Sequence, residues 1–230
     1  MTVREKKYGF LRANALTLAF GFVFLATLVG QALSGVADFN AQQVANGLEQ
    51  VSLLEYVTSS SFGVDVMENW QSEYLQFFLF IYATVWLTQL GSNESKEVGK
   101  EGKETDKEQK VGRYTHSTSP AWAKVGGWRT ALYSRSLGTL MAVLFLLTWG
   151  ASSIAGWAAY NSEQLADRED PVSWLGYLGA ADFWNRSFQN WQSEMLAVGS
   201  MAVFSVYLRH RGSAESKPVG ESHATTGSSG

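Results

Sequence analysis

Four stretches of the sequence contain no Asp, Glu, Lys or Arg. They are residues 13–37, 74–93, 136–162 and 195–208, with lengths of 25, 20, 27 and 14 residues. A helix needs roughly 20 apolar residues, within a range of about 17–25, to cross the hydrocarbon core of a bilayer. Three stretches reach this length and the fourth nearly does. Because only 17% of the residues are charged, against about a quarter in average globular chains, we expect a membrane protein.

The chain also repeats itself. Residues 11–99 align with residues 132–220 without a gap, and about 30 of the 89 aligned positions are identical. The strongest match is the pentad Asn-Trp-Gln-Ser-Glu, which occurs at 69–73 and again at 190–194. Two pentads in register over such a length indicate a tandem duplication of one unit, which consists of a helix, a long loop and a second helix.

This duplication predicts the domain organisation. The first repeat covers residues 1–99, with spans at about 13–35 and 70–90, and the second covers 132–220, with spans at about 137–157 and 191–208. A charged cytoplasmic linker is expected at 100–131, and a disordered tail at 221–230. The first apolar stretch is longer than a signal-peptide core and has an internal counterpart, so we expect it to remain as a span.

The placement of Lys and Arg predicts the orientation. Segments 1–12, 91–135 and 209–230 carry four, nine and three of these residues, whereas the loops 36–69 and 158–190 carry none and two. Because basic residues accumulate on the cytoplasmic side, both termini and the linker should be cytoplasmic in a multi-pass protein of the cell membrane. Each repeat crosses twice, so the two repeats should be parallel.

The expected fold is therefore all-α, a four-span transmembrane helical bundle made of two parallel hairpin repeats. The two outer loops are long, and loops of that length without any structure are uncommon. Each contains a short amphipathic segment that begins with a plausible N-cap, Ser52 in the first loop and Ser173 in the second. We expect these segments to be interfacial helices on the outer leaflet.

The pentads supply the candidate site residues. Asn69 and Asn190 could cap the second and fourth spans, and the tryptophans that follow would then lie at the membrane interface. The glutamates would lie in the first helical turn, where the helix dipole favours a carboxylate. The eight candidates, functional or helix-capping, are Asn69, Trp70, Gln71, Glu73, Asn190, Trp191, Gln192 and Glu194.

A second interpretation of the pentads is functional. Glu73 and Glu194 could face each other near the pseudo-twofold axis and bind a proton or a cation. Each glutamate, however, would lie only about one turn, roughly 6 Å, below its cap. That depth is at the rim of the membrane and not at its midplane. We therefore favour the structural interpretation and keep the proton or cation site as the alternative.

The composition excludes several kinds of site. The chain has no cysteine, so thiolate metal sites, iron–sulfur clusters and cysteine nucleophiles are excluded. None of the three histidines lies in a charge-free stretch, which argues against a haem held between spans. No nucleophile–base pair, phosphate loop or metal-ligand spacing is present. We accordingly expect no catalytic, cofactor-binding or metal-binding residue, no cofactor, and, at a net charge of -3, no nucleic-acid partner.

With the duplicated hairpin and its pentads, the chain resembles an uncharacterised family of bacterial integral membrane proteins with a domain of unknown function. The resemblance covers roughly residues 8–220 and includes the stretch Gly-Trp-Arg-Thr-Ala-Leu-Tyr at 127–133. It implies a bacterial membrane protein with four spans. It implies no activity and no catalytic residue.

Three classes of function are compatible with these patterns. The first is a non-enzymatic structural or accessory membrane protein, whose partner is the lipid bilayer. The second is transport of a small ion or solute that uses Glu73 and Glu194. The third is a membrane enzyme acting at the outer face. The lack of a midplane charge argues against transport, and the lack of a nucleophile or metal set argues against an enzyme. We favour the first class and leave open a protein partner or a homo-oligomer.

Overall fold

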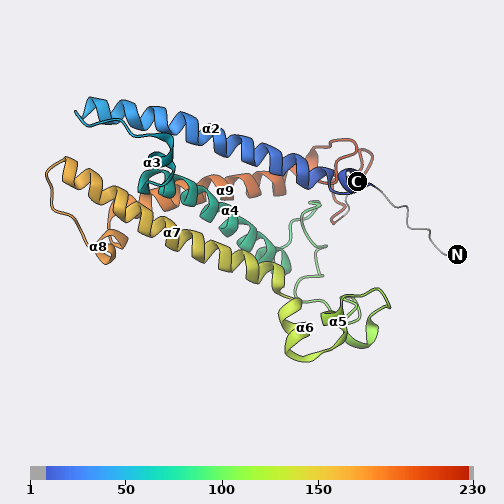
Figure 1. Cartoon of the computed structure of the whole chain (residues 1–230). Coiled ribbons are helices and arrows are strands. Elements are labelled where there is room, and N and C mark those ends of the chain that lie inside the picture. The colour runs from blue at the N-terminus through green and yellow to red at the C-terminus, as the bar shows by residue number, and fades with distance from the viewer. Residues whose placement is uncertain (1–8, 228–230) are drawn as a thin grey trace. The chain divides into compact units, whose positions relative to one another are not determined.

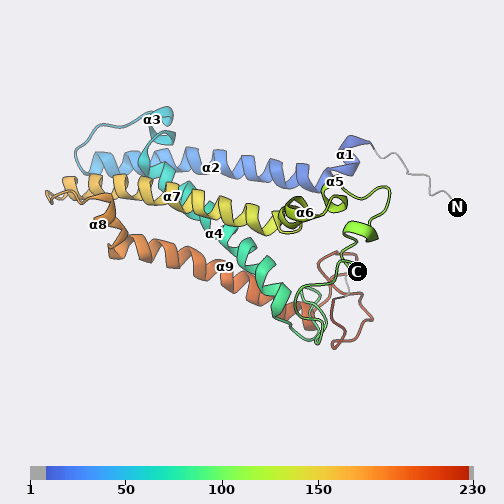
Figure 2. The same cartoon turned by 90° about the horizontal axis from the view of Figure 1, so that it is seen from below.

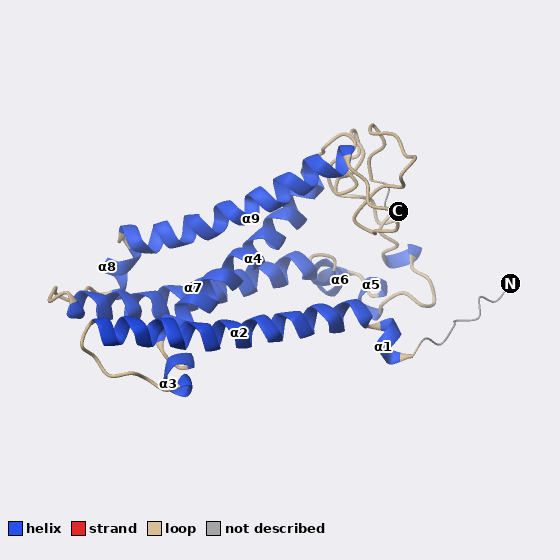
Figure 3. Cartoon of the chain, turned by 90° about the horizontal axis from the view of Figure 1, so that it is seen from above, coloured by secondary structure: helices blue, strands red, loops and turns tan. Residues whose placement is uncertain are grey.

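The computed structural model describes residues 9–227, and this part of the chain contains helices and loops but no strand (Figure 3). It divides into two compact units, Met1–Gly63 and Val64–Gly230. The boundary lies inside the helix α4 (Ser60–Trp86) and not between the predicted repeats.

The first unit consists mainly of one long helix. A short helix, α1 (Phe10–Ala13), precedes α2 (Ala15–Ala45), and α3 (Leu53–Val57) lies in the loop that follows (Figure 1). Asn40 fastens this loop to α2, because its side-chain amide donates to the carbonyl of Val51 at 2.9 Å and its carbonyl accepts from the N–H of Val51 at 2.8 Å. The buried Tyr56 of α3 packs against Gly35 of α2.

The second unit contains the remaining helices. They are η1 (Gly112–Tyr114), α5 (Ala121–Lys124), α6 (Gly127–Tyr133), α7 (Ser136–Ala166), α8 (Trp174–Leu178) and α9 (Ala181–Tyr207), together with α4 from Val64 onward. The helices α7 and α9 run in opposite directions, and α8 lies between the end of one and the beginning of the other (Figure 2). At the other end of α7, the buried Gly138 lets the ring of Tyr82 from α4 approach closely.

The helices α4 and α9 run in the same direction. Near their first residues, Arg186 of α9 forms an ion pair with Glu68 of α4 at 3.2 Å. At their other ends, the hydroxyl group of Ser205 in the last turn of α9 is hydrogen-bonded at 3.0 Å to that of Ser92, in the loop that follows α4. The two helices are thus connected at both ends.

The short helices predicted in the two loops are present, and each has a serine cap. Ser52 accepts a hydrogen bond from the N–H of Glu55, whose carboxylate accepts from the N–H of Ser52 in return. Ser173 accepts from the N–H of Gly176 at 3.1 Å. Each cap satisfies a backbone donor that has no partner inside the helix.

Helix lengths and loop contacts recur along the chain. The helices α2 and α7 each have 31 residues, α3 and α8 each have 5, and α4 and α9 each have 27. Asn161 fastens its loop to Val172 through the same pair of hydrogen bonds, at 3.0 and 2.9 Å, that Asn40 makes with Val51. Tyr177 packs against Gly156, as Tyr56 packs against Gly35.

Two helices of the described part are long and apolar enough to cross a membrane, α2 and α7. The most apolar window of α2 has a mean hydropathy of 2.0 with none of its residues buried, and that of α7 has 1.7 with 22% buried. A core helix of a water-soluble protein would bury such a surface. The helices α4 and α9 are not among those apolar enough to cross a membrane, so the structure supports two of the four predicted spans.

The segment after α9 differs from the expected disordered tail. Lys217 is 1% exposed, and its ammonium group, with three N–H donors, lies within hydrogen-bonding distance of four backbone carbonyls. These belong to Gly91 at 2.5 Å, Ser222 at 3.1 Å, His223 at 3.1 Å and Thr225 at 3.0 Å. We predicted disorder for residues 221–227. They are instead held against the loop that follows α4, because the buried ammonium group of Lys217 binds carbonyls of both segments.

Candidate functional site between α4 and α9

The two pentads meet where α4 and α9 pack against each other. The indole N–H of Trp191 donates to the side-chain carbonyl of Gln71 at 2.8 Å. The hydroxyl of Ser72, which is 2.9 Å from the carbonyl of Asn69, also lies 3.4 Å from the carboxylate of Glu194. Gln71 and Ser72 are both 1% exposed. A polar side chain can be buried at this depth only when it is hydrogen-bonded, so both contacts are part of the packing.

The predicted capping role of the pentads is wrong. The helices begin at Ser60 and Ala181, well before Asn69 and Asn190, which lie in the helix interiors. Each asparagine amide donates to the carbonyl four residues earlier, from Asn69 to Asp65 at 2.7 Å and from Asn190 to Arg186 at 2.9 Å.

The start of α4 is set instead by Ser59, whose hydroxyl accepts from the N–H of Phe62 at 3.2 Å. A stretch of sequence without charges and the helix that contains it need not begin at the same residue. For the same reason Glu73 and Glu194 lie far from the first helical turn, where we expected them to interact with the helix dipole.

The predicted pentad residues differ in their contacts and in their burial. Gln71, Trp191 and Glu194 take part in the contact between the helices. Trp70 is partly buried, whereas Glu73 and Gln192 are exposed. The sequence does not distinguish these positions, because the two pentads are identical.

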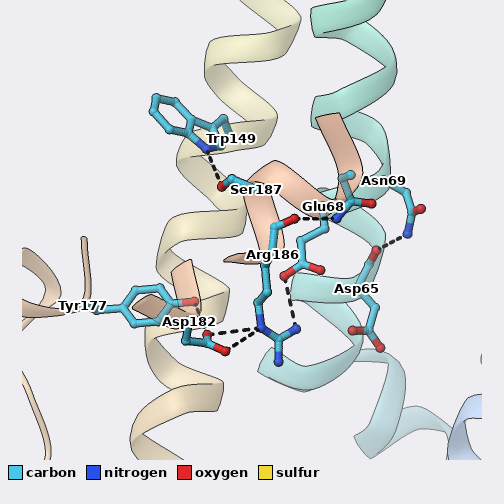
Figure 4. Close-up of polar contacts among 9 residues, drawn as sticks. Asp65, Glu68, Asn69, Trp149, Tyr177, Asp182, Arg186 and Ser187 are labelled. Carbon is cyan, nitrogen blue, oxygen red and sulfur yellow. Dashed lines mark hydrogen bonds and ion pairs between the residues drawn. The ribbon is translucent and has the colours of Figure 1, made fainter. Parts of the chain in front are cut away.

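A network of charged side chains lies within about two helical turns before the pentads (Figure 4). Arg186 is its centre and binds carboxylates from both helices. Its guanidinium group contacts Glu68 of α4 at 3.2 Å and both carboxylate oxygens of Asp182 of α9 at 3.2 Å. Tyr177 of α8 donates from its hydroxyl to Asp182 at 3.1 Å. Side chains of three helices therefore meet around the Arg186–Asp182 ion pair.

The electrostatics of this network follow from its partial burial. The network precedes the predicted spans at 70–90 and 191–208. Burial raises the pKa of Asp65 and of Glu68, and the charge of Arg186 offsets only part of that effect. Burial opposes the charge of Arg186 as well, but Glu68 and Asp182 raise its pKa above the ordinary value, so the guanidinium stays protonated.

Tyr177 is the side chain that connects the outer loop to the network. It is 1% exposed, and burial, followed by the charge of Asp182, raises the pKa of its hydroxyl. Ser173 caps the helix that carries it, and Gly156 leaves room for its ring. The loop thus places a neutral hydrogen-bond donor on the carboxylate of Asp182.

Aromatic rings fill the space between α7 and α9 beside the network. Trp149 of α7 lies at their centre, and its indole N–H contacts the hydroxyl of Ser187 at 3.4 Å. Its ring neighbours are Phe145, Phe183, Trp184 and Trp191, with centroids 5.6–6.1 Å away. Aromatic pairs at this separation add stability beyond the area that they bury.

The chemistry available to this arrangement is proton or cation binding by carboxylates. Asp65, Glu68 and Asp182 carry three negative formal charges against the single positive charge of Arg186. Among the residues that the structure describes, no group of three or more His, Cys, Asp or Glu side chains is arranged to hold a metal ion. In the structure, Glu68, Asp182 and Arg186 form the ion pairs that stabilise the contact between α4 and α9.

This network was not predicted from the sequence, although the sequence contains one signal of it. Asp182 and Arg186 are four residues apart and Asp65 and Glu68 are three apart, which places each pair on one helix face. Asp65 and Arg186 occupy corresponding positions in the alignment of the two repeats, which are offset by 121 residues. A search for identical residues passes over such positions, because here the two halves carry opposite charges.

Together, the fold and the site define an all-helical protein with two helices that could cross a membrane and with polar contacts between two neighbouring helices. The chain belongs to the family described as a domain of unknown function (DUF6766), which matches residues 7–228. No curated protein and no solved structure matches the chain.

Proposed function

We propose that the chain is a multi-pass protein of a bacterial cell membrane, built from two parallel copies of a helical hairpin, with four spans and both termini in the cytoplasm. The exposed apolar surfaces of α2 and α7 support membrane embedding. The equal lengths of the corresponding helices and the matching Asn40 and Asn161 contacts support the duplication. The segregation of Lys and Arg supports the orientation.

For its role, we propose a non-enzymatic structural or accessory membrane protein whose partner is the lipid bilayer. One observation carries this proposal. The most conspicuous polar groups of the repeated pentads, on Gln71, Ser72 and Trp191, are used in contacts within the chain. Side chains that are buried and bonded in this way hold two helices together and are not presented to a substrate.

A second candidate is proton or cation transport. It is favoured by the excess of carboxylates around Arg186 and by the raised pKa of Asp65 and Glu68, since a carboxyl group that retains its proton can exchange it. In this case Glu73 and Glu194 would extend the path from the network along α4 and α9.

Topology is tested by cysteine labelling, because the chain has no cysteine of its own. We expect single cysteines at Gln50 and Asp170 to react with an impermeant maleimide from outside intact cells. Cysteines at Thr105 and Ala214 should react only after the membrane is opened. Labelling of Thr105 from outside would contradict the proposed orientation.

The role is tested by flux measurements on the purified protein in proteoliposomes. A structural protein should leave the decay of an imposed proton or potassium gradient unchanged relative to empty vesicles. A flux that the protein accelerates and that Glu68→Gln abolishes would replace the structural role by transport. Glu101→Gln, a change of the same chemistry in the linker, is the matched control.

A further inference from the structure

The helices α5 and α6 form a hairpin with small side chains inside and large apolar side chains outside. Ala123 and Thr130 are its buried residues, and the hydroxyl of Thr130 donates to the carbonyl of Trp122 at 2.6 Å. Trp128 is 68% exposed and Val125 is 57% exposed. A hairpin surrounded by water would be expected to bury its large apolar side chains and expose its small ones.

The charges of this segment are of one sign. Residues 109–135 contain five basic residues and no acidic one, whereas residues 94–108 contain six acidic residues. The five are Lys110, Arg113, Lys124, Arg129 and Arg135. Lys124, Arg129 and Arg135 are exposed, and none of the three forms an ion pair with a residue that the structure describes. The guanidinium of Arg129 lies 5.5 Å from the ring centre of Trp128.

The hairpin lies immediately before the apolar helix α7. The helix α6 ends at Tyr133 and α7 begins at Ser136, so only two residues separate them (Figures 1 and 2). If α7 crosses a membrane, the short connection holds α6 close to the membrane surface at which α7 enters.

We propose that the α5–α6 hairpin docks on the anionic headgroups of the leaflet from which α7 enters the bilayer. Its tryptophans and aliphatic side chains insert at headgroup level, and its basic side chains contact lipid phosphates. This inference rests on the proposed membrane embedding of α7 and deepens it, since it assigns a lipid class to one surface of the protein.

Anionic lipid accounts for both features of the hairpin. Tryptophan is favoured at the interface because its ring is apolar and its N–H remains hydrated. Within the described residues, Lys124 and Arg135 hydrogen-bond only to backbone carbonyls, of Ser117 and Ala131, so their charges are not neutralised. Such basic residues are attracted by the negative surface potential of anionic lipids, and their long stems let them reach the headgroups. An apolar protein partner would explain the exposed tryptophans but not the absence of acidic residues.

The test uses the full-length protein with a spin label at Val125→Cys, reconstituted into phosphatidylcholine vesicles with or without phosphatidylserine. Depth is measured from the accessibility of the label to oxygen and to a water-soluble paramagnetic reagent. We expect an immersed label in the vesicles that contain phosphatidylserine and a more hydrated one in phosphatidylcholine alone. Neutralising Lys124, Arg129 or Arg135 to Gln should lower the ratio of docked to free hairpin about fivefold for each residue.

The matched control is Lys103→Gln, which also removes one positive charge but in the acidic half of the linker, and it should leave the depth unchanged. A label that stays hydrated in both lipids, or is immersed equally in both, would overturn the proposal. A cysteine at Thr105 in the same vesicles reports the side of the membrane independently. A wrong orientation is thus distinguished from a hairpin that does not dock.

Discussion

The indole of Trp191 and the side-chain carbonyl of Gln71 form a hydrogen bond of 2.8 Å that joins the two copies of the same pentad. The contact is not symmetric, because Gln71 is buried whereas its counterpart Gln192 is exposed. Identical sequences therefore occupy different environments, and substitutions at equivalent positions should differ in their effect.

Replacing Trp191 by Phe should lower the free energy of unfolding by about 1–3 kcal/mol, because the buried carbonyl of Gln71 loses its donor. Thermal unfolding in detergent measures this loss. Gln192→Leu is the control and should have little effect. Gln71→Leu removes the acceptor of the same hydrogen bond. If it lowered the free energy of unfolding no more than Gln192→Leu, the contact would not contribute to stability.

Gly156→Ala should destabilise the loop that carries Tyr177. A Cβ atom at this position would lie 2.5 Å from the hydroxyl oxygen of Tyr177 and 3.2 Å from its ring. The ring must shift, which disturbs its hydrogen bond to Asp182. Gly150→Ala, in the same helix with no atom within 4 Å of the added Cβ, should be neutral or slightly stabilising. Limited proteolysis of the loop 167–180 distinguishes the two variants, and equal protection would refute the close packing.

Asp65→Asn should raise stability at neutral pH and lose that advantage in acid. The pKa of Asp65 is raised by burial, so its ionised form is the one that folding disfavours. Below the ordinary pKa of about 4, Asp65 is protonated in both the folded and the unfolded state, and the wild-type protein is not destabilised. As pH rises through the raised pKa of the folded state, the carboxylate ionises and the free energy of unfolding of the wild type falls. The gain should stay below about 1 kcal/mol, because the group is only partly buried. Melting temperatures from pH 4 to 8 test this, with the exposed Asp106→Asn as control, and a gain that is largest in acid would contradict it.

Arg186→Gln should destabilise the contact between α4 and α9 by about 2 kcal/mol, because Glu68 and Asp182 would remain partly buried without their cation. Arg168→Gln removes the same charge from the exposed loop and should have little effect. Chemical unfolding of both variants measures the difference. Similar free energies of unfolding for Arg186→Gln and Arg168→Gln would mean that the network does not stabilise the contact between α4 and α9.

Lys217→Met should release the C-terminal segment, because four carbonyls lose one shared donor. We expect the local free energy of opening to fall by more than about 2 kcal/mol, and protease cleavage between residues 218 and 226 to accelerate accordingly. Lys96→Met is the control at the corresponding position, where the ammonium group binds Gly102 and Glu104 and is less buried. An unchanged cleavage rate in Lys217→Met would show that the contacts of the Lys217 ammonium group do not hold the C-terminal segment in place.

Much of the helical architecture could be predicted because long charge-free stretches and serine caps are local signals. The caps at Ser52 and Ser173 begin α3 and α8 as expected. The starts of α4 and α9 were misjudged, because Asn69 and Asn190 are good capping residues and the contacts that keep them inside a helix are not local. Arg186 contacts Glu68 across a separation of 118 residues, and no periodicity within one helix indicates such a partner.

The direction of α4 relative to α9 is the central claim, and disulfide formation between engineered cysteines tests it most directly. Since the hydroxyl groups of Ser92 and Ser205 are 3.0 Å apart, the pair Ser92→Cys and Ser205→Cys should cross-link rapidly in membrane vesicles under mild oxidation. The pair Ser92→Cys and Ser193→Cys should not, because twelve residues of helix separate Ser193 from Ser205 by about 18 Å. Cross-linking of the second pair, or none in the first, would contradict parallel helices joined through their pentads.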